Sequence, residues 1–497
     1  MFNIPLFYKS VKRESDTMHP KIIYNCLSLH CEISFVTFQP YSTIKVLHHM
    51  KKYFVLAVLS ASLFSQQPAS YAHDIARPSE EWVKKGIIYE IYTRAFSKEG
   101  NFSGIEKKLP ELKKLGVTTL WLMPIHPVGI EKRKGSLGSP YSIKDYYGIN
   151  PEFGNLNDFK RLVKKSHALG FKIIIDLVAN HTSWDSKIFK EHPEWFTKDS
   201  TGRFVPPVAD WSDVVDLNYN NKEMRRYMIE MLKYWVRNIG LDGFRCDVAE
   251  MVPTDFWNEA RVALDSIKPI MMLSEGQLPE HHLKAFDLTY SWNFYGTIKD
   301  VIDGNKPISE FDSVIARETR EYPRQSLRMR FSSNHDENAW DNPDVIRLGD
   351  EGAKLAAVIV NTFPGVPLLY NGQEVGSKKT LGLFEKFEID WTVGSEWREF
   401  YTKLYSIRKN NPALSVGSFE RVINNNPEKI YSFIRSSGKN TVIVLFNGTT
   451  QEELAALFLP ADIPLKFIDA FTGSPVRFKN AAKITLPPQG YKILIVQ

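Results

Sequence analysis

An arginine and an aspartate lie two positions apart in the run Gly243-Phe244-Arg245-Cys246-Asp247-Val248-Ala249-Glu250, at the end of a short apolar stretch. On an extended strand successive side chains point to opposite faces, so Arg245 and Asp247 share one face. The positive charge of such an arginine lowers the pKa of the carboxyl group and fixes its rotamer. The pair therefore suits either an ionised nucleophile or a structural ion pair at a strand end.

Further polar side chains follow other apolar runs of the chain. These residues are Asp176, Asn180, His181, Glu275, His335 and Asp336. Cleavage of a glycosidic bond needs one carboxylate as nucleophile and one protonated carboxylic acid to assist the leaving oxygen. A further anion can stabilise the positive charge of the transition state. Asp247, Glu275 and Asp336 would supply these three groups if the fold brings them together.

The elements that must position these acids alternate between strand-like and helical patterns. Eight apolar, β-rich runs are expected as strands at 86–92, 117–125, 171–178, 241–247, 269–274, 286–290, 328–332 and 366–370. Amphipathic segments such as 105–115 and 158–169 lie between them and read as helices. Alternation at this spacing predicts a parallel sheet, and eight strands predict a closed (β/α)8 TIM barrel. Active sites of such barrels lie at the C-terminal ends of the strands, where the acids are found.

Two further regions depart from this alternation. Residues of about 180–219 are rich in Trp, Asp, Pro and Ser without clear periodicity, and we expect a small inserted lobe after the third strand. From residue 412 to residue 497, short alternating strands and turns predict a C-terminal antiparallel β-sandwich domain. The catalytic barrel with its lobe would then span 73–411.

The first 72 residues do not read as part of the fold. Residues 50–72 have a basic start, a short apolar stretch and a small-residue cleavage site, as in a secretory signal peptide. A membrane anchor is the alternative, but the apolar run is shorter than the ~20 residues that span a bilayer. We interpret residues 1–49 as a non-native upstream extension. The mature protein is expected to be periplasmic or secreted, with no membrane attachment after cleavage.

Charge and cysteine content exclude some classes of function. Of 63 Lys and Arg and 57 Asp and Glu, seven and three lie in residues 1–72, which leaves 56 against 54. This balance gives no support to a nucleic-acid partner. Cys26 and Cys31 precede the expected cleavage site, so the mature chain would keep only Cys246 and form no internal disulfide. Cys246 is expected to pack in the core.

Six segments together resemble the conserved regions of the alpha-amylase family of glycoside hydrolases, family 13. Four of them are Asp176-Leu177-Val178-Ala179-Asn180-His181, Gly243-Phe244-Arg245-Cys246-Asp247, Ser274-Glu275-Gly276 and Asn334-His335-Asp336. The first expected strand and the segment at 365–374 resemble two more. Their order matches that family over residues 86–376.

The resemblance implies a role for each matched residue. Asp247 would be the nucleophile, Glu275 the general acid/base and Asp336 the transition-state stabiliser. A further set would bind or support the reacting sugar: Arg245 by orienting Asp247, His181 and His335 by binding hydroxyls, Tyr141 by stacking, and Asp176 as a support. The resemblance implies retention of configuration, with the two reacting carboxyl groups roughly 5 to 5.5 Å apart. Arg245 is expected to keep the pKa of Asp247 low, and the neighbouring carboxylates to raise that of Glu275.

The resemblance leaves two roles open for Asn180, calcium binding and plain hydrogen bonding. Many family members hold a structural calcium between barrel and lobe, and Asn180 matches one ligand position, although it suits a plain hydrogen-bonding role equally. No cofactor is required for the chemistry itself. The oligomeric state is left open.

The resemblance implies an enzyme, a retaining α-glucan hydrolase of alpha-amylase type that acts on starch or maltooligosaccharides. Typical family members carry Lys-His shortly after the nucleophile, where this chain has Glu250-Met251. That departure, with Asp216-Leu217-Asn218 in the lobe, keeps other activities open. These are neopullulanase-like, oligosaccharide α-glucosidase-like or glucanotransferase activity, and, from another class, a non-catalytic glycan-binding barrel.

Overall fold

A computed structural model describes residues 70–461, 463, 466–477 and 482–496. The proposed upstream extension and most of the proposed signal peptide, with Cys26 and Cys31, lie outside the described residues.

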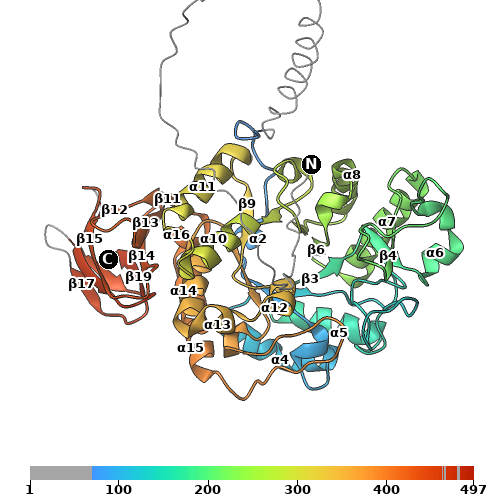
Figure 1. Ribbon diagram of the computed structural model, residues 1–497, viewed down its shortest axis with the longest axis horizontal. Coiled ribbons are helices and arrows are strands. Elements are labelled where there is room, and N and C mark those ends of the chain that lie inside the picture. Colours follow the sequence, from blue (N-terminus) through green and yellow to red (C-terminus); the bar gives the residue numbers. More distant parts are fainter. Residues whose placement is uncertain (1–69, 462, 464–465, 478–481, 497) are drawn as a thin grey trace, which may run out of the picture. The chain divides into compact units, whose positions relative to one another are not determined.

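Eight parallel strands close into a barrel, which confirms the expected fold (Figure 1). In spatial order around the barrel they are β1 (Ile88–Ile91), β10 (Val366–Tyr370), β9 (Leu327–Arg330), β8 (Leu288–Tyr290), β7 (Met271–Ser274), β6 (Gly243–Cys246), β3 (Lys172–Leu177) and β2 (Thr119–Leu122). Each observed strand overlaps an expected one. Most are shorter than the expected run.

Helices cover the outside of the barrel. They include α4 (Phe102–Leu115), α5 (Leu156–Ala168), α7 (Lys222–Tyr234), α8 (Thr254–Asp265), α10 (Trp292–Ile302), α11 (Glu310–Glu321), α14 (Gly349–Thr362) and α15 (Ser395–Asn410). Sequence signals at their ends explain where several begin. Asn155, for example, caps α5 by accepting hydrogen bonds from the backbone N–H groups of Asn157 and Asp158. The apolar faces of these helices and one face of the strands form a large core cluster, which includes the buried free thiol of Cys246. Alternate strand residues such as Ile88, Trp121 and Ile174 belong to a second buried cluster.

The segment after β3 forms the inserted lobe. It contains β4 (His181–Ser183), α6 (Lys187–Glu191), a short 3-10 helix (Pro193–Trp195) and β5 (Val214–Asp216). Strands β4 and β5 pair antiparallel, and this pairing brings His181 opposite Asp216. The lobe therefore starts directly at the C-terminal end of a barrel strand.

The C-terminal part is antiparallel β structure, as expected. It follows α16 (Pro412–Val416) and forms one sheet of β11 (Ser418–Arg421), β13 (Ile430–Ser437), β14 (Asn440–Asn447), β19 (Tyr491–Val496), β16 (Lys466–Asp469) and β17 (Pro475–Arg477). A second sheet contains β12 (Ile423–Asn424), β15 (Glu453–Phe458) and β18 (Ala482–Leu486). Buried Arg435 on β13 donates a 2.7 Å hydrogen bond to the carbonyl of Thr362 at the end of α14, which joins this sheet to the barrel.

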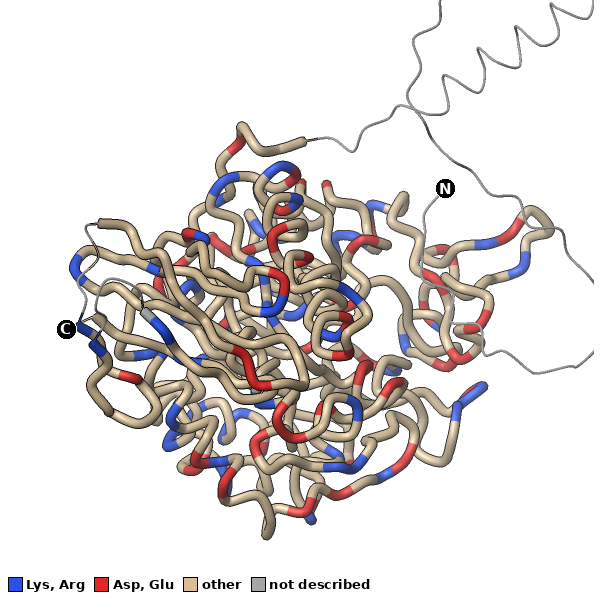
Figure 2. Tube along the Cα trace, turned by 60° about the vertical axis from the view of Figure 1, so that its left-hand side comes forward, with Lys and Arg blue, Asp and Glu red and all other residues tan. Residues whose placement is uncertain are grey.

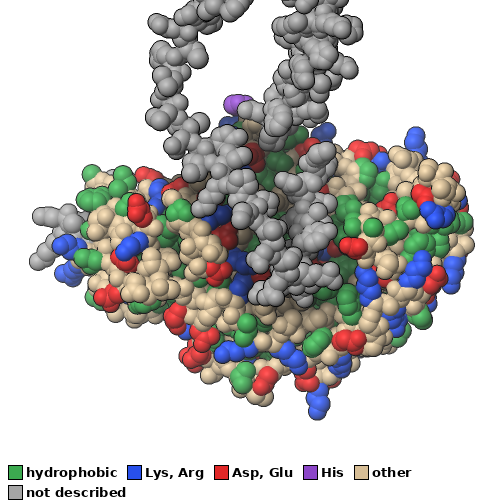
Figure 3. Space-filling model, viewed as in Figure 1, with side chains coloured by type: hydrophobic (Ala, Val, Ile, Leu, Met, Phe, Trp, Pro, Cys, Tyr) green, Lys and Arg blue, Asp and Glu red, His purple; other side chains and the backbone are tan. Residues whose placement is uncertain are grey.

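Lysine and arginine residues are interspersed with aspartate and glutamate along the described chain (Figure 2). The face in Figure 3 likewise shows both signs mixed where grey atoms do not cover it. Among the described residues, no helix combines the length and the apolar character needed to cross a bilayer.

A buried glutamate joins the first and last strands of the barrel. The hydroxyl of Tyr89 on β1 donates to one carboxyl oxygen of Glu374, and the N–H of Gly372 donates to the other at 2.9 Å. Burial raises the pKa of Glu374 from 4.5 to about 7. The folded protein therefore binds this proton more tightly than the unfolded chain does.

We expect this group to make the protein less stable as the pH rises from about 4.5 to 7, by about 3 kcal/mol in total. The stabilising proton is fully bound below the unfolded pKa and is lost as the pH rises through the folded pKa. Glu374→Gln imitates the protonated form, so its free energy of unfolding should exceed that of the wild type above pH 7. Denaturant titrations across this pH range measure the difference.

The control is Glu318→Gln. Glu318 forms an ion pair with Arg330 at 2.6 Å, which outweighs the effect of burial and lowers its pKa. This variant should be less stable than the wild type at neutral pH. Equal effects of the two substitutions would contradict the assignment of opposite pKa shifts.

Candidate active site

Arg245 lies at the centre of a cluster of carboxylates at the C-terminal ends of β3, β6 and β7. Its guanidinium group is fully buried, and Nη1 lies 2.8 Å from Asp176 Oδ1 and 2.8 Å from Asp247 Oδ1. Its Nη2 lies 2.8 Å from Glu275 Oε1. The parallel register explains this meeting, because Asp176 pairs with Arg245 across β3 and β6, and Cys246 with Ser274 across β6 and β7.

The two acids proposed for the chemistry thus contact one guanidinium group. Asp247 and Glu275 keep 9% and 13% of their side-chain surface exposed, so both are reachable from the mouth of the barrel. Two carboxylates on neighbouring nitrogens of one planar group lie close together. This is compatible with the short separation of a double displacement.

The turn after Asp247 brings the acid on β7 against the backbone of β6. Val248 has a positive φ of 37°, which is unfavourable for a β-branched residue. In this conformation its N–H donates a 2.6 Å hydrogen bond to Glu275 Oε2. The strained residue therefore helps to hold Glu275, and such strain is often found at functional sites.

The third acid reaches the site from the other side of the barrel. Asp336 is the second residue of α12 (His335–Trp340), which follows β9 after four residues, and it keeps 35% of its side chain exposed. His335 is buried beside it, with Nε2 3.4 Å from Asp336 Oδ2. The ring of Tyr141 stacks on that of His335 with centroids 5.4 Å apart.

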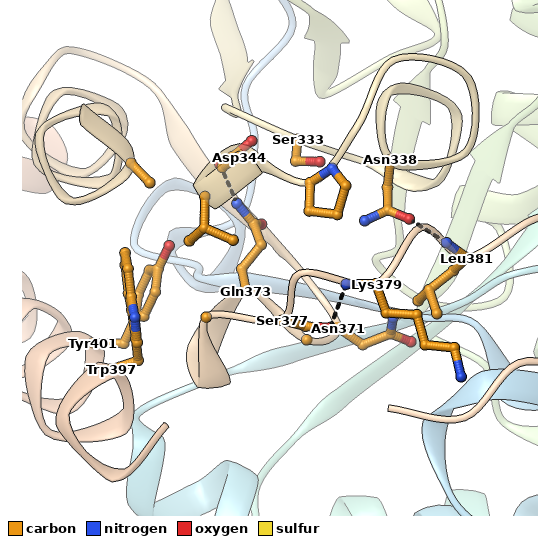
Figure 4. A pocket seen from close by; sticks show the side chains of 15 residues that line it. Ser333, Asn338, Asp344, Asn371, Gln373, Ser377, Lys379, Leu381, Trp397 and Tyr401 are labelled. Atoms are coloured by element: carbon orange, nitrogen blue, oxygen red, sulfur yellow. Dashed lines mark hydrogen bonds between the residues drawn. The ribbon is translucent and has the colours of Figure 1, made fainter. Parts of the chain in front are cut away.

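A small polar pocket supports the segment that carries Asp336 (Figure 4). Ser332 and Gln373 donate hydrogen bonds of 2.5 and 2.7 Å to Asp344 Oδ2, and Asn338 Oδ1 accepts one of 2.7 Å from the N–H of Leu381. These bonds tie α12 to the loop after β10. The pocket has a free volume of only about 10 Å³, room for a single water molecule, so we regard it as structural support.

His181 lies at the start of the inserted lobe. It is buried, and the ring of Trp211 contacts it edge to face with centroids 5.4 Å apart. Burial lowers the pKa of His181 to about 3, so the ring is neutral at ordinary pH. A neutral imidazole can both donate and accept a hydrogen bond, as binding of a sugar hydroxyl requires.

The pKa of Glu275 is raised, as expected, but the pKa of Asp247 differs from the expectation. Burial raises the pKa of Glu275, and the charge of Asp336 raises it further, although Arg245 acts against both effects. Burial and the charge of Glu275 raise the pKa of Asp247 as well, in spite of Arg245. The expectation that Arg245 keeps the pKa of Asp247 low was therefore wrong.

The reason is that Arg245 has three carboxylate partners and not one. Its single positive charge is shared among Asp176, Asp247 and Glu275, so it does not offset burial at any single group. The cluster consequently holds a proton readily. This favours the presence of one protonated acid, as general acid catalysis requires.

Asn180 was the candidate calcium ligand. It is buried, and its side-chain nitrogen lies 3.3 Å from His181 Nδ1. Two nearby acids of the lobe are already paired with lysines, Asp213 with Lys134 at 3.0 Å and Asp185 with Lys144 at 2.9 Å. The described residues contain no group of three or more His, Cys, Asp or Glu suited to a metal. Calcium binding at Asn180 stays a prediction, and no step of the chemistry is derived through a metal.

One polar residue at the site was not identified from the sequence. Glu90, near the end of β1, is fully buried, and its Oε1 lies 2.5 Å from His335 Nδ1. Glu90 lies inside the expected strand at 86–92, so its position did not indicate a polar residue at the end of a strand. The observed β1 ends at Ile91, which makes Glu90 the penultimate residue.

Comparison with known proteins gives consistent matches. The alpha amylase catalytic domain family matches residues 90–208 and 194–412, and the maltogenic amylase C-terminal domain family matches residues 420–493. The crystal structure of a noncanonic maltogenic alpha-amylase AmyB from Thermotoga neapolitana is similar with a TM-score of 0.77 and 36% identity, over 83% of this chain and 99% of that one.

Two curated relatives are more distant. Alpha-amylase 2 of Dictyoglomus thermophilum is 28% identical over 415 residues, which cover 75% of this chain and 71% of the relative. Neopullulanase 2 of Thermoactinomyces vulgaris is 26% identical over 473 residues, which cover 83% of this chain and 78% of the relative.

Proposed function

Since the chain belongs to the alpha-amylase family of glycoside hydrolases, and is thus an enzyme acting on O-glycosyl bonds, we propose that it hydrolyses α-glucosidic bonds of maltooligosaccharides with retention of configuration. The observation that carries this proposal is the contact of both Asp247 and Glu275 with the guanidinium group of Arg245. This arrangement brings a nucleophile and an acid to one bond.

The proposed reaction has two displacements. Asp247 attacks the anomeric carbon while Glu275 donates its proton to the leaving oxygen, which forms a covalent glycosyl-enzyme. A water molecule then gives a proton to Glu275 and attacks the same carbon, which releases Asp247. Asp336 stabilises the positive charge that develops on the sugar ring in both steps, and Tyr141, His181 and His335 hold that sugar.

We expect the first product from maltotriose or a longer maltooligosaccharide to be the α-anomer. Two inversions at one carbon restore the original configuration. Proton NMR during the first minutes of reaction, before mutarotation, distinguishes the α from the β signal. A β-anomer as first product would contradict the double displacement.

A specific observation favours the alternative of a neopullulanase-like or transferring enzyme. Glu250 and Met251 replace the Lys-His of typical members on the leaving-group side, and both are exposed, Met251 by 43%. The carboxylate of Glu250 accepts a hydrogen bond from the N–H of Gln277, two residues after Glu275. An acidic and an apolar side chain therefore border the site where the leaving sugar binds. The relative named neopullulanase is consistent with this alternative.

A product profile on starch, pullulan, cyclodextrin and maltotriose separates these activities. Preferred cleavage of starch would support the amylase, and preferred cleavage of pullulan or cyclodextrin the alternative. Products longer than the maltotriose substrate would reveal transfer. If none of these substrates is cleaved or transferred, the remaining reading is a glycan-binding barrel, which the presence of all three acids disfavours.

We further propose that the protein acts outside the cytoplasm, because residues 50–72 have the pattern of a signal peptide. N-terminal sequencing of the protein from a periplasmic or culture fraction tests this. A mature N-terminus near His73 is expected.

A further inference from the structure

Glu90 is a buried acid to which the proposed mechanism gives no role. Its side chain is fully buried at the end of β1, and one oxygen lies 2.5 Å from His335 Nδ1. Its other oxygen, Oε2, has no hydrogen-bond partner among the described residues. Isolating a carboxylate in this way costs free energy unless a positive charge compensates it. Among the described residues, the ring of His335 is in contact with Glu90 and can carry this charge, and the charge of Arg245 also acts on Glu90.

We propose that Glu90 is a positioning residue of the active site, which fixes the ring of His335 and keeps it in the doubly protonated, cationic form toward the sugar. This inference rests on the proposed function, since the sugar is assigned there. The pairing of Glu90 and His335 themselves follows from the geometry alone.

The hydrogen-bond chain supports the cationic form. An ionised Glu90 only accepts, so Nδ1 of His335 must carry a proton. The Nε2 atom lies 2.7 Å from the hydroxyl of Tyr141, and this hydroxyl lies 3.2 Å from Asp176 Oδ2. Tyr141 has one proton to donate. It can give this proton to Asp176 only if Nε2 of His335 is itself a donor.

Burial raises the pKa of Glu90, and the charges of His335 and Arg245 act against this effect. A neutral His335 beside an ionised Glu90 would break this order. With its proton on Nδ1, Nε2 would need the proton of Tyr141, and Asp176 would lose that donor. A cationic His335 satisfies all three contacts at once. In this form Nε2 of His335, which lies 3.4 Å from Asp336 Oδ2, carries a proton and no lone pair.

The charged groups around His335 come from several strands of the barrel. Its surroundings contain Glu90 on β1, Trp121 on β2, Tyr141 in the loop after β2, Asp176 on β3, Arg245 on β6, Glu275 after β7 and Asp336 beside it. Four of these groups are acids and one is a cation. Burial alone lowers the pKa of His335, but the charges of Asp336 and Glu90 raise it to about 9.

The cationic ring would act on catalysis and not only on binding. It lies against Asp336, the group proposed to stabilise the transition state, and helps to orient that carboxylate. Loss of the charge should therefore lower kcat more than it changes KM.

The experiment uses Glu90→Gln in the full-length enzyme. Glutamine keeps an oxygen that accepts from Nδ1 but removes the negative charge. NMR titration of protein with labelled histidine, with the His335 signal assigned by His335→Asn, should show the pKa of His335 falling by at least two units from about 9. In parallel, kcat on maltotriose should fall at least tenfold at pH 8 and approach the wild-type value near pH 6, where the ring is protonated again.

Glu374→Gln is the matched control. Glu374 is a buried glutamate that contacts Tyr89, the neighbour of Glu90 in the chain, and does not contact His335. This variant should leave the pKa of His335 unchanged. A loss of kcat in Glu90→Gln that is equal at all pH values, with an unchanged His335 titration, would reduce Glu90 to a structural residue and overturn the proposal.

Two further measurements keep the proposal testable. If Glu90→Gln does not fold, the wild-type titration alone decides, because a His335 pKa near its ordinary value of 6.5 overturns the inference. The titration needs no substrate. An enzyme that fails on all α-glucans while His335 titrates near 9 would therefore contradict the proposed function and leave the pairing of Glu90 and His335 intact.

Discussion

Asp247→Asn should lower kcat on maltooligosaccharides by on the order of 10⁴-fold or more, since an amide is not a nucleophile for the anomeric carbon. The substitution keeps the size of the side chain and one oxygen that can face Arg245. Substrate affinity and the folded structure should therefore change little. Steady-state kinetics and calorimetric binding of maltotriose measure the two effects separately.

Asp242→Asn is the matched control for this prediction. Asp242 precedes the same strand, β6, at its opposite end, and its carboxylate lies 2.7 Å from His167 and 3.3 Å from Lys172. This variant should lose stability and keep kcat, because it lies far from the carboxylate cluster along the strand. If Asp247→Asn keeps more than a few per cent of wild-type kcat, Asp247 is not the nucleophile. An equal loss of kcat in both variants would show that the loss in Asp247→Asn is not specific to the carboxylate cluster.

Glu275→Gln should lower kcat on natural oligosaccharides by roughly 10² to 10⁴-fold, the usual contribution of a general acid. The loss should be much smaller on an α-glucosyl fluoride, because fluoride leaves without needing a proton. Burial and the charge of Asp336 raise the pKa of Glu275, so the wild-type rate falls when this acid loses its proton at higher pH. The alkaline limb of the pH–rate profile that belongs to Glu275 should be absent in the variant.

Azide provides a second measurement on the same variant. Once the fluoride has formed the glycosyl-enzyme, azide can attack it without the base that water requires. We expect faster turnover with azide and an α-glucosyl azide as product, as retention demands. An equal loss on oligosaccharide and fluoride, with no effect of azide, would show that Glu275 is not the acid/base.

The strands of the barrel could be read from local pattern because each is a short apolar run of the chain. The expected run at 366–370 is β10, and the run at 241–247 contains β6. A parallel strand buried on both faces needs apolar residues in succession, and this signal is local. The acids at the ends of these runs could be identified for the same reason, because a charged residue that follows an apolar run can be recognised from the sequence alone.

Contacts between residues that are far apart in the chain could not be predicted from local sequence patterns. Glu90 and His335 are 245 residues apart, and nothing in either segment indicates that a buried carboxylate meets that ring. Closure of the barrel places β1 beside β10, two strands from β9, and so brings the end of β1 toward the segment after β9. That neighbourhood depends on the closure of the whole sheet.

The pair Arg245 and Asp247 illustrates the difference between features that depend on local sequence and contacts that depend on the tertiary structure. The sequence by itself determined that both lie on one face of a strand and that Asp247 stands among three acids at strand ends, because alternation along a strand is a local property of the backbone. Only the tertiary structure decided that Arg245 also contacts Asp176 and Glu275, through the register of β3 and β7 against β6. A charge shared among three buried carboxylates raises the affinity of the site for a proton, and the electrostatic field of a site depends on all its neighbours in space.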